Sequence, residues 1–523
     1  MPIRGGLSGK QASSPTNLAP PALHGVAAGR TEAAPHEWAA GSLVFVCALA
    51  AIVLVLVVNA ISQGPWLDEF WTLELADTQK STAELTDGWL RDTHPPSFNI
   101  WATLLDALGF HSISLARLAS NLPAIAFLVW TVLCLSRGTL HELSYHTLML
   151  LLVLSLPQSV EAFANYRSYF WQIASLTSLM AIARHVVATH CDLDWRRDRG
   201  LLALSICAIV GALGLHYVGA IFGGLLAALI FLYARTHGHR RWATLVCSTA
   251  AATFAVVTFV AVLQARHWAT DLDHSWIGDQ PATAIISVPL VLVMGALLHN
   301  VIPLIALWPG WRRWTRPERT FVAMIAGVLV GGLTLVLFVD TLQPIMVDRY
   351  LFAVPVLVCG IMASLAAKFE RYYPLRLLVS LSAVAVVACP FLLYGAKSQW
   401  NEGARVIARI VESCPTTRVY AASGWALGPA AATLTARRED AVFRRAYAEL
   451  ATEHNYAVRF LGQGETARTM LGECPVLVWF EHTPNNAEDD PRAAVAASGL
   501  IGIEEATLFT YRSPTGFVVR ADR

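Results

Sequence analysis

The sequence predicts an α-helical protein that crosses a membrane about eleven times, followed by a small α/β domain. Of its 523 residues, 55% are hydrophobic and only 14% are charged, and the mean hydropathy is +0.50. This composition is too apolar for an ordinary soluble domain. Several apolar runs also approach the roughly 20 residues that a helix needs to cross a bilayer, where every backbone polar group must be bonded within the protein.

The chain before the first apolar run is expected to be a disordered cytoplasmic tail. Residues 1–37 are rich in Pro, Ala, Gly and Ser and cannot form a packed core. The apolar run that follows lies too far into the chain, and is too long, for a typical cleaved signal peptide. We therefore expect an uncleaved anchor, and we assign residues 38–396 to a transmembrane domain.

Eleven helical spans are expected in that domain. They lie near residues 40–62, 113–136, 146–165, 168–189, 200–216, 217–234, 242–263, 282–308, 320–340, 350–367 and 375–395. The segment from His94 to Phe110 is not counted, because only about 15 residues follow its two prolines, which is short for a span. We expect this segment to form a helix that lies at the membrane interface.

The linkers between the spans predict the orientation, because basic residues near span ends are retained in the cytoplasm. Arginine-rich linkers alternate with acidic ones along the chain. The basic residues are Arg196, Arg197, Arg199, Arg235, Arg240, Arg241, Arg312, Arg313, Arg316, Arg319, Lys368, Arg371 and Arg376. With eleven spans, the first acidic loop, residues 64–112, and the C-terminal residues 397–523 lie outside the cytoplasm. Counting the segment 94–110 as a span would instead place every arginine-rich linker outside.

Residues 397–523 are expected to form an extracytoplasmic α/β domain. Helix-like stretches at 403–412 and 443–453 alternate with β-rich stretches at 418–421, 456–461 and 475–480, and a hairpin is expected within 506–519. Seven of the nine cysteines are expected in spans or short loops, as small buried hydrophobes. Cys414 and Cys474 lie in the C-terminal domain and can pair if it is exported.

Polar residues at the ends of apolar runs form the candidate site. Ionisable groups at span ends often mark function, although each one alone is better explained as a solvated loop charge. With the orientation above, nine such residues share the outer face, and the set as a whole favours a functional site. They are Asp68, Glu69, His94, Arg167, Tyr169, His216, Tyr217, Arg349 and Tyr350.

These motifs resemble those of the GT-C membrane glycosyltransferases. The likeness is to the family 39 type, which includes protein O-mannosyltransferases and lipid A aminoarabinose and galacturonic acid transferases. It covers roughly residues 40 to 370 and rests above all on Asp68-Glu69 after the first span and His94-Pro95-Pro96 before the interfacial helix. Further matches are Arg167-Ser168-Tyr169, Leu215-His216-Tyr217 and Arg349-Tyr350 followed by Pro355. Ser97-Phe98 replaces the more usual Leu-Tyr after the prolines, and the C-terminal domain lies outside the resemblance.

The resemblance implies transfer of a sugar from a polyprenyl phosphate donor to a lipid, glycan or protein acceptor, with inversion at the anomeric carbon. The site would face outward from a bacterial inner membrane. Asp68, with Glu69 beside it, is the expected general base. Arg167 and Arg349 can grip the donor phosphate, and His94 or His216 can add donors. Tyr169, Tyr217 and Tyr350 suit an interfacial substrate site.

Other functions and ligands fit the sequence less well. A transporter or lipid flippase, the main alternative, would show ionisable residues at mid-span, whereas here they cluster at span ends. Asp271 and Asp273, with His267 and His274, are better explained as an acidic loop than as a divalent metal site, so no cofactor is expected. Gly462 to Ala467 is expected to be a turn rather than a nucleotide-binding loop. The net charge of +1 argues against a nucleic-acid partner.

Overall fold

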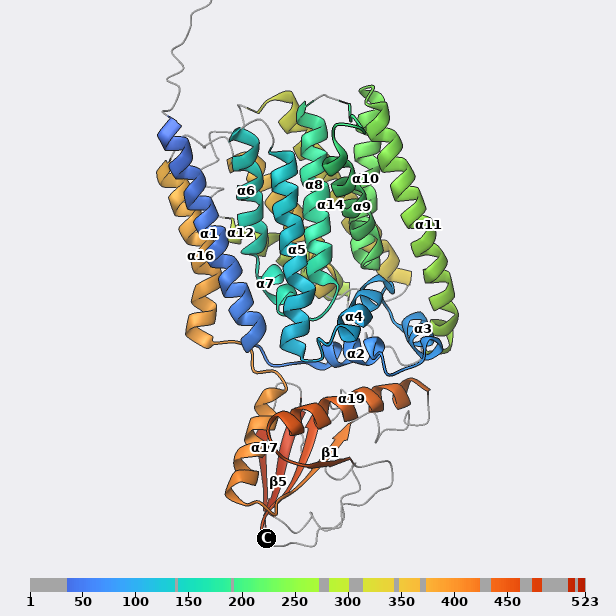
Figure 1. Ribbon diagram of the computed structural model, residues 1–523, viewed down its shortest axis with the longest axis vertical. Helices are drawn as coiled ribbons and strands as arrows, with labels where there is room; N and C mark the ends of the chain where they lie inside the picture. Colours follow the sequence, from blue (N-terminus) through green and yellow to red (C-terminus); the bar gives the residue numbers. More distant parts are fainter. Residues whose placement is uncertain are drawn as a thin grey trace, which may run out of the picture.

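The computed structural model has two parts, a helical bundle and a small C-terminal domain below it (Figure 1). It describes residues 35–136, 140–189, 192–271, 282–300, 314–342, 348–366, 373–423, 434–460, 473–481, 507–512 and 516–522. The expected tail, the loop around Asp273 and the turn at Gly462 lie outside these residues or almost entirely so.

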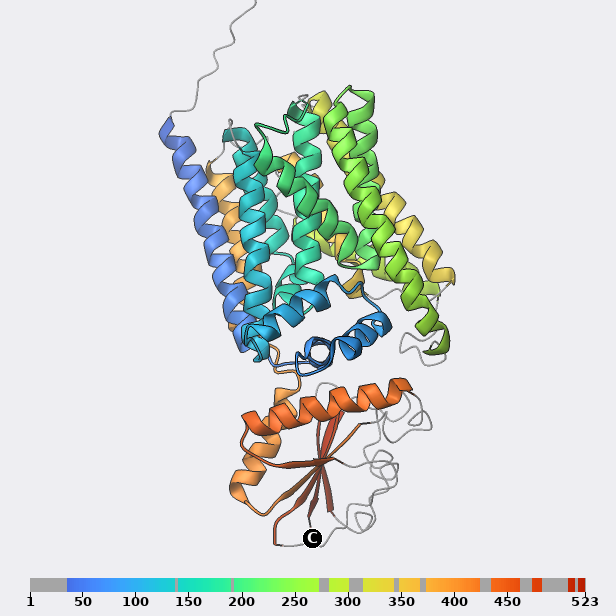
Figure 2. The same cartoon turned by 45° about the vertical axis from the view of Figure 1, so that its right-hand side comes forward.

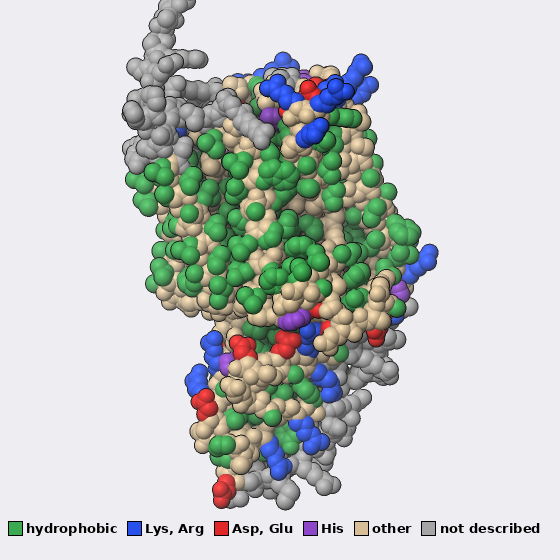
Figure 3. All heavy atoms as spheres, viewed as in Figure 1, with side chains coloured by type: hydrophobic (Ala, Val, Ile, Leu, Met, Phe, Trp, Pro, Cys, Tyr) green, Lys and Arg blue, Asp and Glu red, His purple; other side chains and the backbone are tan. Residues whose placement is uncertain are grey.

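The bundle consists of apolar helices, most of which are long. They are α1 (Pro35–Ser62), α5 (Ile113–Leu135), α6 (Leu140–Leu154), α7 (Pro157–Phe163), α8 (Tyr169–Thr189), α9 (Arg199–Gly214), α10 (Tyr217–Thr236), α11 (Arg240–Asp271), α12 (Ala282–His299), α14 (Arg316–Leu342), α15 (Ala353–Ala366) and α16 (Tyr373–Tyr394). Exposed Leu, Val and Phe side chains cover the outside of the bundle (Figure 3). That apolar surface is what a lipid environment requires.

The chain is a polytopic membrane protein. Within the described residues, six helices are long and apolar enough to cross a membrane, and a seventh span is formed if the bent pair α6 and α7 is counted as one. Helices α9, α12 and α15 are apolar but shorter, and α8, which carries Gln172, Ser175 and Arg184, lies almost entirely buried inside the bundle. Each of the eleven expected ranges contains a helix, but the number of membrane crossings stays a prediction.

Three short helices lie between α1 and α5, at the end of the bundle that faces the C-terminal domain (Figure 2). They are α2 (Leu67–Ala76), α3 (Thr82–Arg91) and α4 (Ser97–Ala107). Helix α4 has 11 residues, so its length of about 17 Å is far below the ~30 Å of a bilayer core. It buries Phe98, Ala102 and Leu105 and exposes Ile100 and Leu104, a pattern suited to a helix that lies along an interface.

Most of the exposed arginines of the bundle gather at its other end, whereas Arg266 of α11 is exposed near the C-terminal domain. Figure 3 shows a group of basic side chains at the top, away from the C-terminal domain. The linkers between α8 and α9 and between α10 and α11, and the first turns of α14, lie at that end. Their exposed arginines are Arg196, Arg197, Arg199, Arg235, Arg240, Arg241, Arg316 and Arg319.

The C-terminal domain is a mixed sheet with two helices. Its described strands are β1 (Arg418–Ser423), β2 (Val458–Phe460), β3 (Val476–Glu481), β4 (Thr507–Arg512) and β5 (Gly516–Asp522), in the order β2-β1-β3-β5-β4. Strand β1 pairs in parallel with β2 and β3, whereas β5 pairs antiparallel with β3 and β4. Helices α17 (Asn401–Ser413) and α19 (Leu434–Glu453) complete it. The predicted strands are confirmed, but α19 begins earlier than the stretch 443–453 that the sequence predicted. Cys414 and Cys474 form a disulfide.

Candidate active site

The two acidic residues that open α2 have different surroundings. Glu69 is fully buried, and each of its carboxylate oxygens accepts two hydrogen bonds. Oε1 accepts from Arg117 Nε at 2.7 Å and from the Tyr166 amide at 2.8 Å. Oε2 accepts from Arg117 NH2 at 2.5 Å and from the Trp66 amide at 3.3 Å. Because this carboxylate is enclosed and saturated with donors, it holds the chain in place and has no route to a substrate proton.

Asp68 instead faces two guanidinium groups. Its Oδ2 lies 3.4 Å from Arg349 NH1 and 4.0 Å from Arg167 NH2, and the Asp68 side chain keeps 20% of its surface exposed. One turn further along α2, Thr72 Oγ1 accepts a hydrogen bond from Arg167 NH1 at 3.1 Å. Consecutive residues on a helix point about 100° apart, so Asp68 and Glu69 cannot share an environment.

An aromatic and imidazole cluster adjoins this charged group. The ring of His216 lies 5.0 Å from that of His94, 4.8 Å from that of Tyr350 and 5.7 Å from that of Tyr169, measured between centroids. The Arg349 guanidinium lies 5.1 Å from the centroid of the Trp66 ring. The cluster is assembled from segments that are far apart in sequence. His94 lies in the loop before α4, Tyr169 at the start of α8, His216 between α9 and α10, and Tyr350 in η3 (Asp348–Tyr350).

His94 lies next to the buried carboxylate of Asp92. Asp92 Oδ1 lies 3.6 Å from His94 Nδ1, while Asp92 also accepts hydrogen bonds from the Thr93 amide at 2.8 Å and from Asn99 Nδ2 at 2.9 Å. Burial by itself would raise the pKa of Asp92, but the hydrogen bond and charge of His94 and the charge of Arg167 outweigh it and lower the pKa to about 2. Asp92 is therefore ionised at neutral pH.

His216 lies between α9 and α10, outside both helices, and caps α10. Its Nδ1 accepts a hydrogen bond from the Gly219 amide, which leaves Nε2 as the protonated nitrogen of the neutral ring. Burial and the positive charge of neighbours such as His94 and Arg167 hold the pKa of His216 well below its ordinary value. A neutral imidazole with an Nε2–H group is a hydrogen-bond donor that adds no charge to the site.

Tyr217 hydrogen-bonds to Gln264 of α11. Its hydroxyl donates to the side-chain oxygen of Gln264, and Gln264 Nε2 donates in turn to the backbone oxygens of Trp89 and His94, both at 2.9 Å. Gln264 is fully buried on α11. The pair thus fixes the loop that carries His94, and Tyr217 lies outside the ring cluster.

The arrangement is suited to binding an anion. Two positively charged guanidinium groups lie within 4.0 Å of Asp68 Oδ2, whose carboxylate carries a single negative charge. The other nearby carboxylate, Asp92, is already hydrogen-bonded by its own donors. Within the described part of the chain, Asp68 Oδ2 and the Tyr169 hydroxyl are buried without a hydrogen-bond partner, a condition that a ligand would relieve. Those same residues hold no group of three His, Cys, Asp or Glu side chains placed to bind a metal ion.

Four residues of this network were not singled out in the sequence: Thr72, Asp92, Arg117 and Gln264. Only two of them carried a usable signal. Asp92 lies two residues before His94, and Arg117 is a charged residue inside an otherwise apolar helix, where a charge requires a partner. Thr72 and Gln264 have ordinary local contexts, so only the packing of the helices assigns them.

Comparisons with known proteins bear on the fold. No family model matches the sequence, and no curated protein matches it. Among solved structures, the chain is similar to ArnT from Cupriavidus metallidurans in the apo state, with a TM-score of 0.52 and 14% identity. A second structure of that protein, bound to undecaprenyl phosphate, gives a TM-score of 0.53 at the same identity. Each comparison covers 91% of this chain and 97% of the other. The chain therefore shares the fold of ArnT, a GT-C membrane glycosyltransferase.

Proposed function

We propose that this protein is an inverting glycosyltransferase that moves a sugar from a polyprenyl phosphate to a lipid, glycan or protein acceptor. The observation that carries the proposal is the placement of Asp68 between Arg167 and Arg349, beside the rings of His94, Tyr169, His216 and Tyr350. The shared fold supports the donor class, because one matching structure of ArnT holds undecaprenyl phosphate.

In the proposed reaction the phosphate of the donor is held by Arg167 and Arg349. A guanidinium offers parallel N–H donors to phosphate oxygens, and the Trp66 ring stacks against the Arg349 head. A phosphate that takes over these two cations also releases Asp68 from them. Binding of the donor and freeing of the base are thereby coupled.

Asp68 then acts as general base. It removes the proton from the acceptor hydroxyl, whose oxygen attacks the anomeric carbon as the bond from that carbon to the phosphate oxygen breaks. The polyprenyl phosphate leaves with the bonding electron pair, and the guanidinium groups stabilise its added negative charge. A single displacement of this kind inverts the anomeric configuration. Glu69 supports Asp68 by fixing the start of α2.

The active face is proposed to lie outside the cytoplasm of a bacterial inner membrane. Two observations support this orientation. Most of the exposed arginines of the bundle lie at the opposite end, as the retention of basic linkers in the cytoplasm requires. The disulfide between Cys414 and Cys474 lies in the C-terminal domain, and such bonds persist in oxidising compartments.

A donor panel tests the function. Purified protein in lipid nanodiscs is incubated with labelled sugars on polyprenyl phosphate and with lipid, glycan and protein fractions as acceptors. Transfer from at least one polyprenyl phosphate sugar, absent from the Asp68→Asn variant, is the expected result. Activity with a soluble nucleotide sugar alone would overturn the donor class. Directional transport of a lipid without formation of any new glycosidic bond would favour the flippase alternative.

A further inference from the structure

Helix α2, which carries Asp68, is capped at its C-terminal end by three side chains. The last four carbonyl groups of a helix have no partner within it. In α2 these include the carbonyls of Leu73, Glu74 and Leu75, which accept hydrogen bonds from Arg445 at 3.2 Å, Lys80 at 2.6 Å and Trp89 at 2.9 Å, respectively. Lys80 and Trp89 belong to the same loop as α2. Arg445 comes from α19 of the C-terminal domain.

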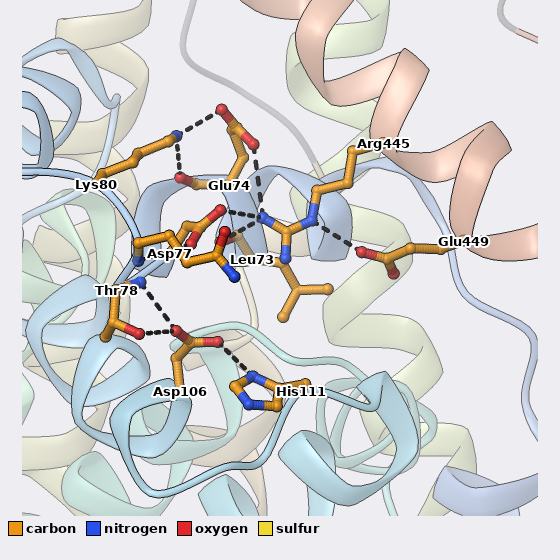
Figure 4. Close-up of polar contacts among 10 residues, drawn as sticks. Leu73, Glu74, Asp77, Thr78, Lys80, Asp106, His111, Arg445 and Glu449 are labelled. Atoms are coloured by element: carbon orange, nitrogen blue, oxygen red, sulfur yellow. Dashed lines mark hydrogen bonds and ion pairs between the residues drawn. The ribbon is translucent and has the colours of Figure 1, made fainter.

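Arg445 makes a fixed set of contacts across this boundary (Figure 4). Its NH1 group lies 3.2 Å from Asp77 Oδ2 and 3.6 Å from Glu74 Oε2, while its Nε donates to Glu449 of its own helix at 2.8 Å. Glu449 thus orients the guanidinium toward α2. A short distance away, Asp106 of α4 accepts hydrogen bonds from the Thr78 amide at 2.9 Å and from His111 Nδ1 at 2.9 Å.

The N-terminal approach to α2 is tied to the same domain. The Gly64 amide donates to the Lys397 carbonyl at 2.9 Å, and the Trp400 amide donates to the Pro65 carbonyl at 3.2 Å. A Cβ atom on Gly64 would lie 2.0 Å from the Ser398 oxygen, so only glycine permits this approach of the two backbones. These tethers fall just before Asp68.

A shared apolar core joins α2 to the C-terminal domain between these two ends. Phe70 and Leu73 of α2 belong to the same cluster of buried side chains as Trp400 and Phe443. The Phe70 and Trp400 rings are 5.8 Å apart, and Trp400 stacks on Phe443 at 5.6 Å. The domain that lies outside the family resemblance is therefore built onto the helix that carries the proposed base.

We infer that the C-terminal domain positions Asp68 for catalysis by holding both ends of α2, with Arg445 as the positioning residue at the far end. The inference rests on the proposed function. Arg167 and Arg349 come from the bundle, so the placement of α2 against the bundle sets their separation from Asp68. A displacement of about 1 Å in reacting groups can lower a rate about 100-fold. The Arg445 side chain keeps 23% of its surface exposed, so solvent partly screens its contacts.

The inference predicts a division between catalysis and donor binding. In Arg445→Ala, kcat for transfer should fall by about tenfold or more, because Asp68 is displaced from the acceptor hydroxyl. The Kd for undecaprenyl phosphate should not rise, because both arginines that grip the phosphate come from the bundle and a displaced Asp68 competes less for them. Arg445→Lys keeps the charge but loses the forked geometry, so its kcat should lie between those of the wild type and Arg445→Ala.

Arg444→Ala is the matched control. It removes the same charge from the adjacent position of α19, but the Arg444 guanidinium lies over the Phe460 ring, 5.3 Å from its centroid. Its kcat should equal that of the wild type. A double variant tests whether Arg445 acts through Asp77. The decrease in ln kcat in Arg445→Ala with Asp77→Asn should be smaller than the sum of the decreases in the two single variants, as expected for residues that act through one contact.

Hydrogen exchange in the α2 amides supplies a readout that does not need activity. Faster exchange at Phe70 to Ala76 in Arg445→Ala, with β3 and β5 protected as in the wild type, is expected together with the loss of kcat. Unchanged exchange, unchanged kcat, or a Kd for undecaprenyl phosphate that rises with the fall in kcat would each overturn the inference. If the wild type transfers no sugar from any donor, the proposed function and the catalytic part of this inference fail together. Exchange still decides whether the domain holds α2.

Discussion

The Arg117 guanidinium donates two hydrogen bonds to the Glu69 carboxylate, at 2.7 and 2.5 Å, and both side chains are fully buried. Arg117 also donates to the carbonyls of Ala60, Gln63 and Gly64, where α1 ends. One side chain from α5 thus joins the end of the first long helix to the start of α2. Glu69, the neighbour of Asp68, is therefore part of a structural anchor, and its carboxylate is already occupied by donors.

This relationship predicts a large loss of stability in Glu69→Ala. The substitution leaves the buried Arg117 charge without its carboxylate, which typically costs about 3–5 kcal/mol. The apparent melting temperature in detergent should fall markedly, while Glu412→Ala at an exposed position of α17 should leave it unchanged. A Glu69→Ala variant as stable as the wild type would show that the pair contributes little.

Asp68→Asn should remove catalysis without unfolding the protein. Asparagine keeps the shape of the side chain but cannot take up the acceptor proton, so transfer should fall about 100-fold or more. The melting temperature should stay close to that of the wild type. The matched control is Asp87→Asn on α3, where Asp87 forms an ion pair with Arg91. Near-normal turnover by Asp68→Asn would rule Asp68 out as the base.

Arg349 should govern the affinity for the donor. A charge-assisted hydrogen bond contributes about 1.5–3 kcal/mol, so Arg349→Ala should raise the Kd for undecaprenyl phosphate about 10- to 100-fold. Arg349→Lys should bind with intermediate affinity, because the ammonium group lacks the forked geometry. Titration of purified protein measures both. The exposed Arg409→Ala serves as control, and equal affinity in all four proteins would remove Arg349 from the phosphate site.

Single-cysteine labelling should show that the C-terminal domain and the arginine-rich end of the bundle lie on opposite sides of the membrane. Thr452 is exposed on α19, whereas Arg319 is exposed on the arginine-rich end of the bundle. In intact cells an impermeant thiol reagent should label Thr452→Cys, but it should label Arg319→Cys only after the membrane is permeabilised. Labelling of Arg319→Cys before permeabilisation would reverse the orientation.

The disulfide should stabilise the C-terminal domain. Cys414 and Cys474 are 60 residues apart, and closing a loop of that size is expected to contribute about 2–4 kcal/mol. Reductant, or Cys414→Ser, should therefore lower the apparent melting temperature. Cys389→Ser, which changes a free cysteine of α16, is the control. A melting temperature that does not respond to reductant would contradict the prediction.

The sequence by itself determined the elements that depend on local pattern. Apolar runs long enough for a bilayer marked the bundle helices, and alternating β-rich stretches marked the strands of the mixed sheet. The two prolines and the short apolar stretch that follows marked α4. The candidate residues His94, Arg167, Tyr169, His216, Arg349 and Tyr350 were found because polar residues beside apolar runs stand out, and the structure brings them around Asp68.

Only the tertiary structure decided what each of those residues contacts. Asp68 and Glu69 are adjacent and chemically alike. Their surroundings differ because α2 is oriented so that Glu69 meets Arg117 of α5, which is 48 positions away in the sequence. Tyr217 likewise bonds to Gln264 instead of joining the rings. Arg445 reaches α2 across 368 positions from Asp77. Local periodicity determines which face of a helix is apolar. It carries no information about which distant side chain contacts that face, because this contact depends on the packing of the whole bundle and of the C-terminal domain.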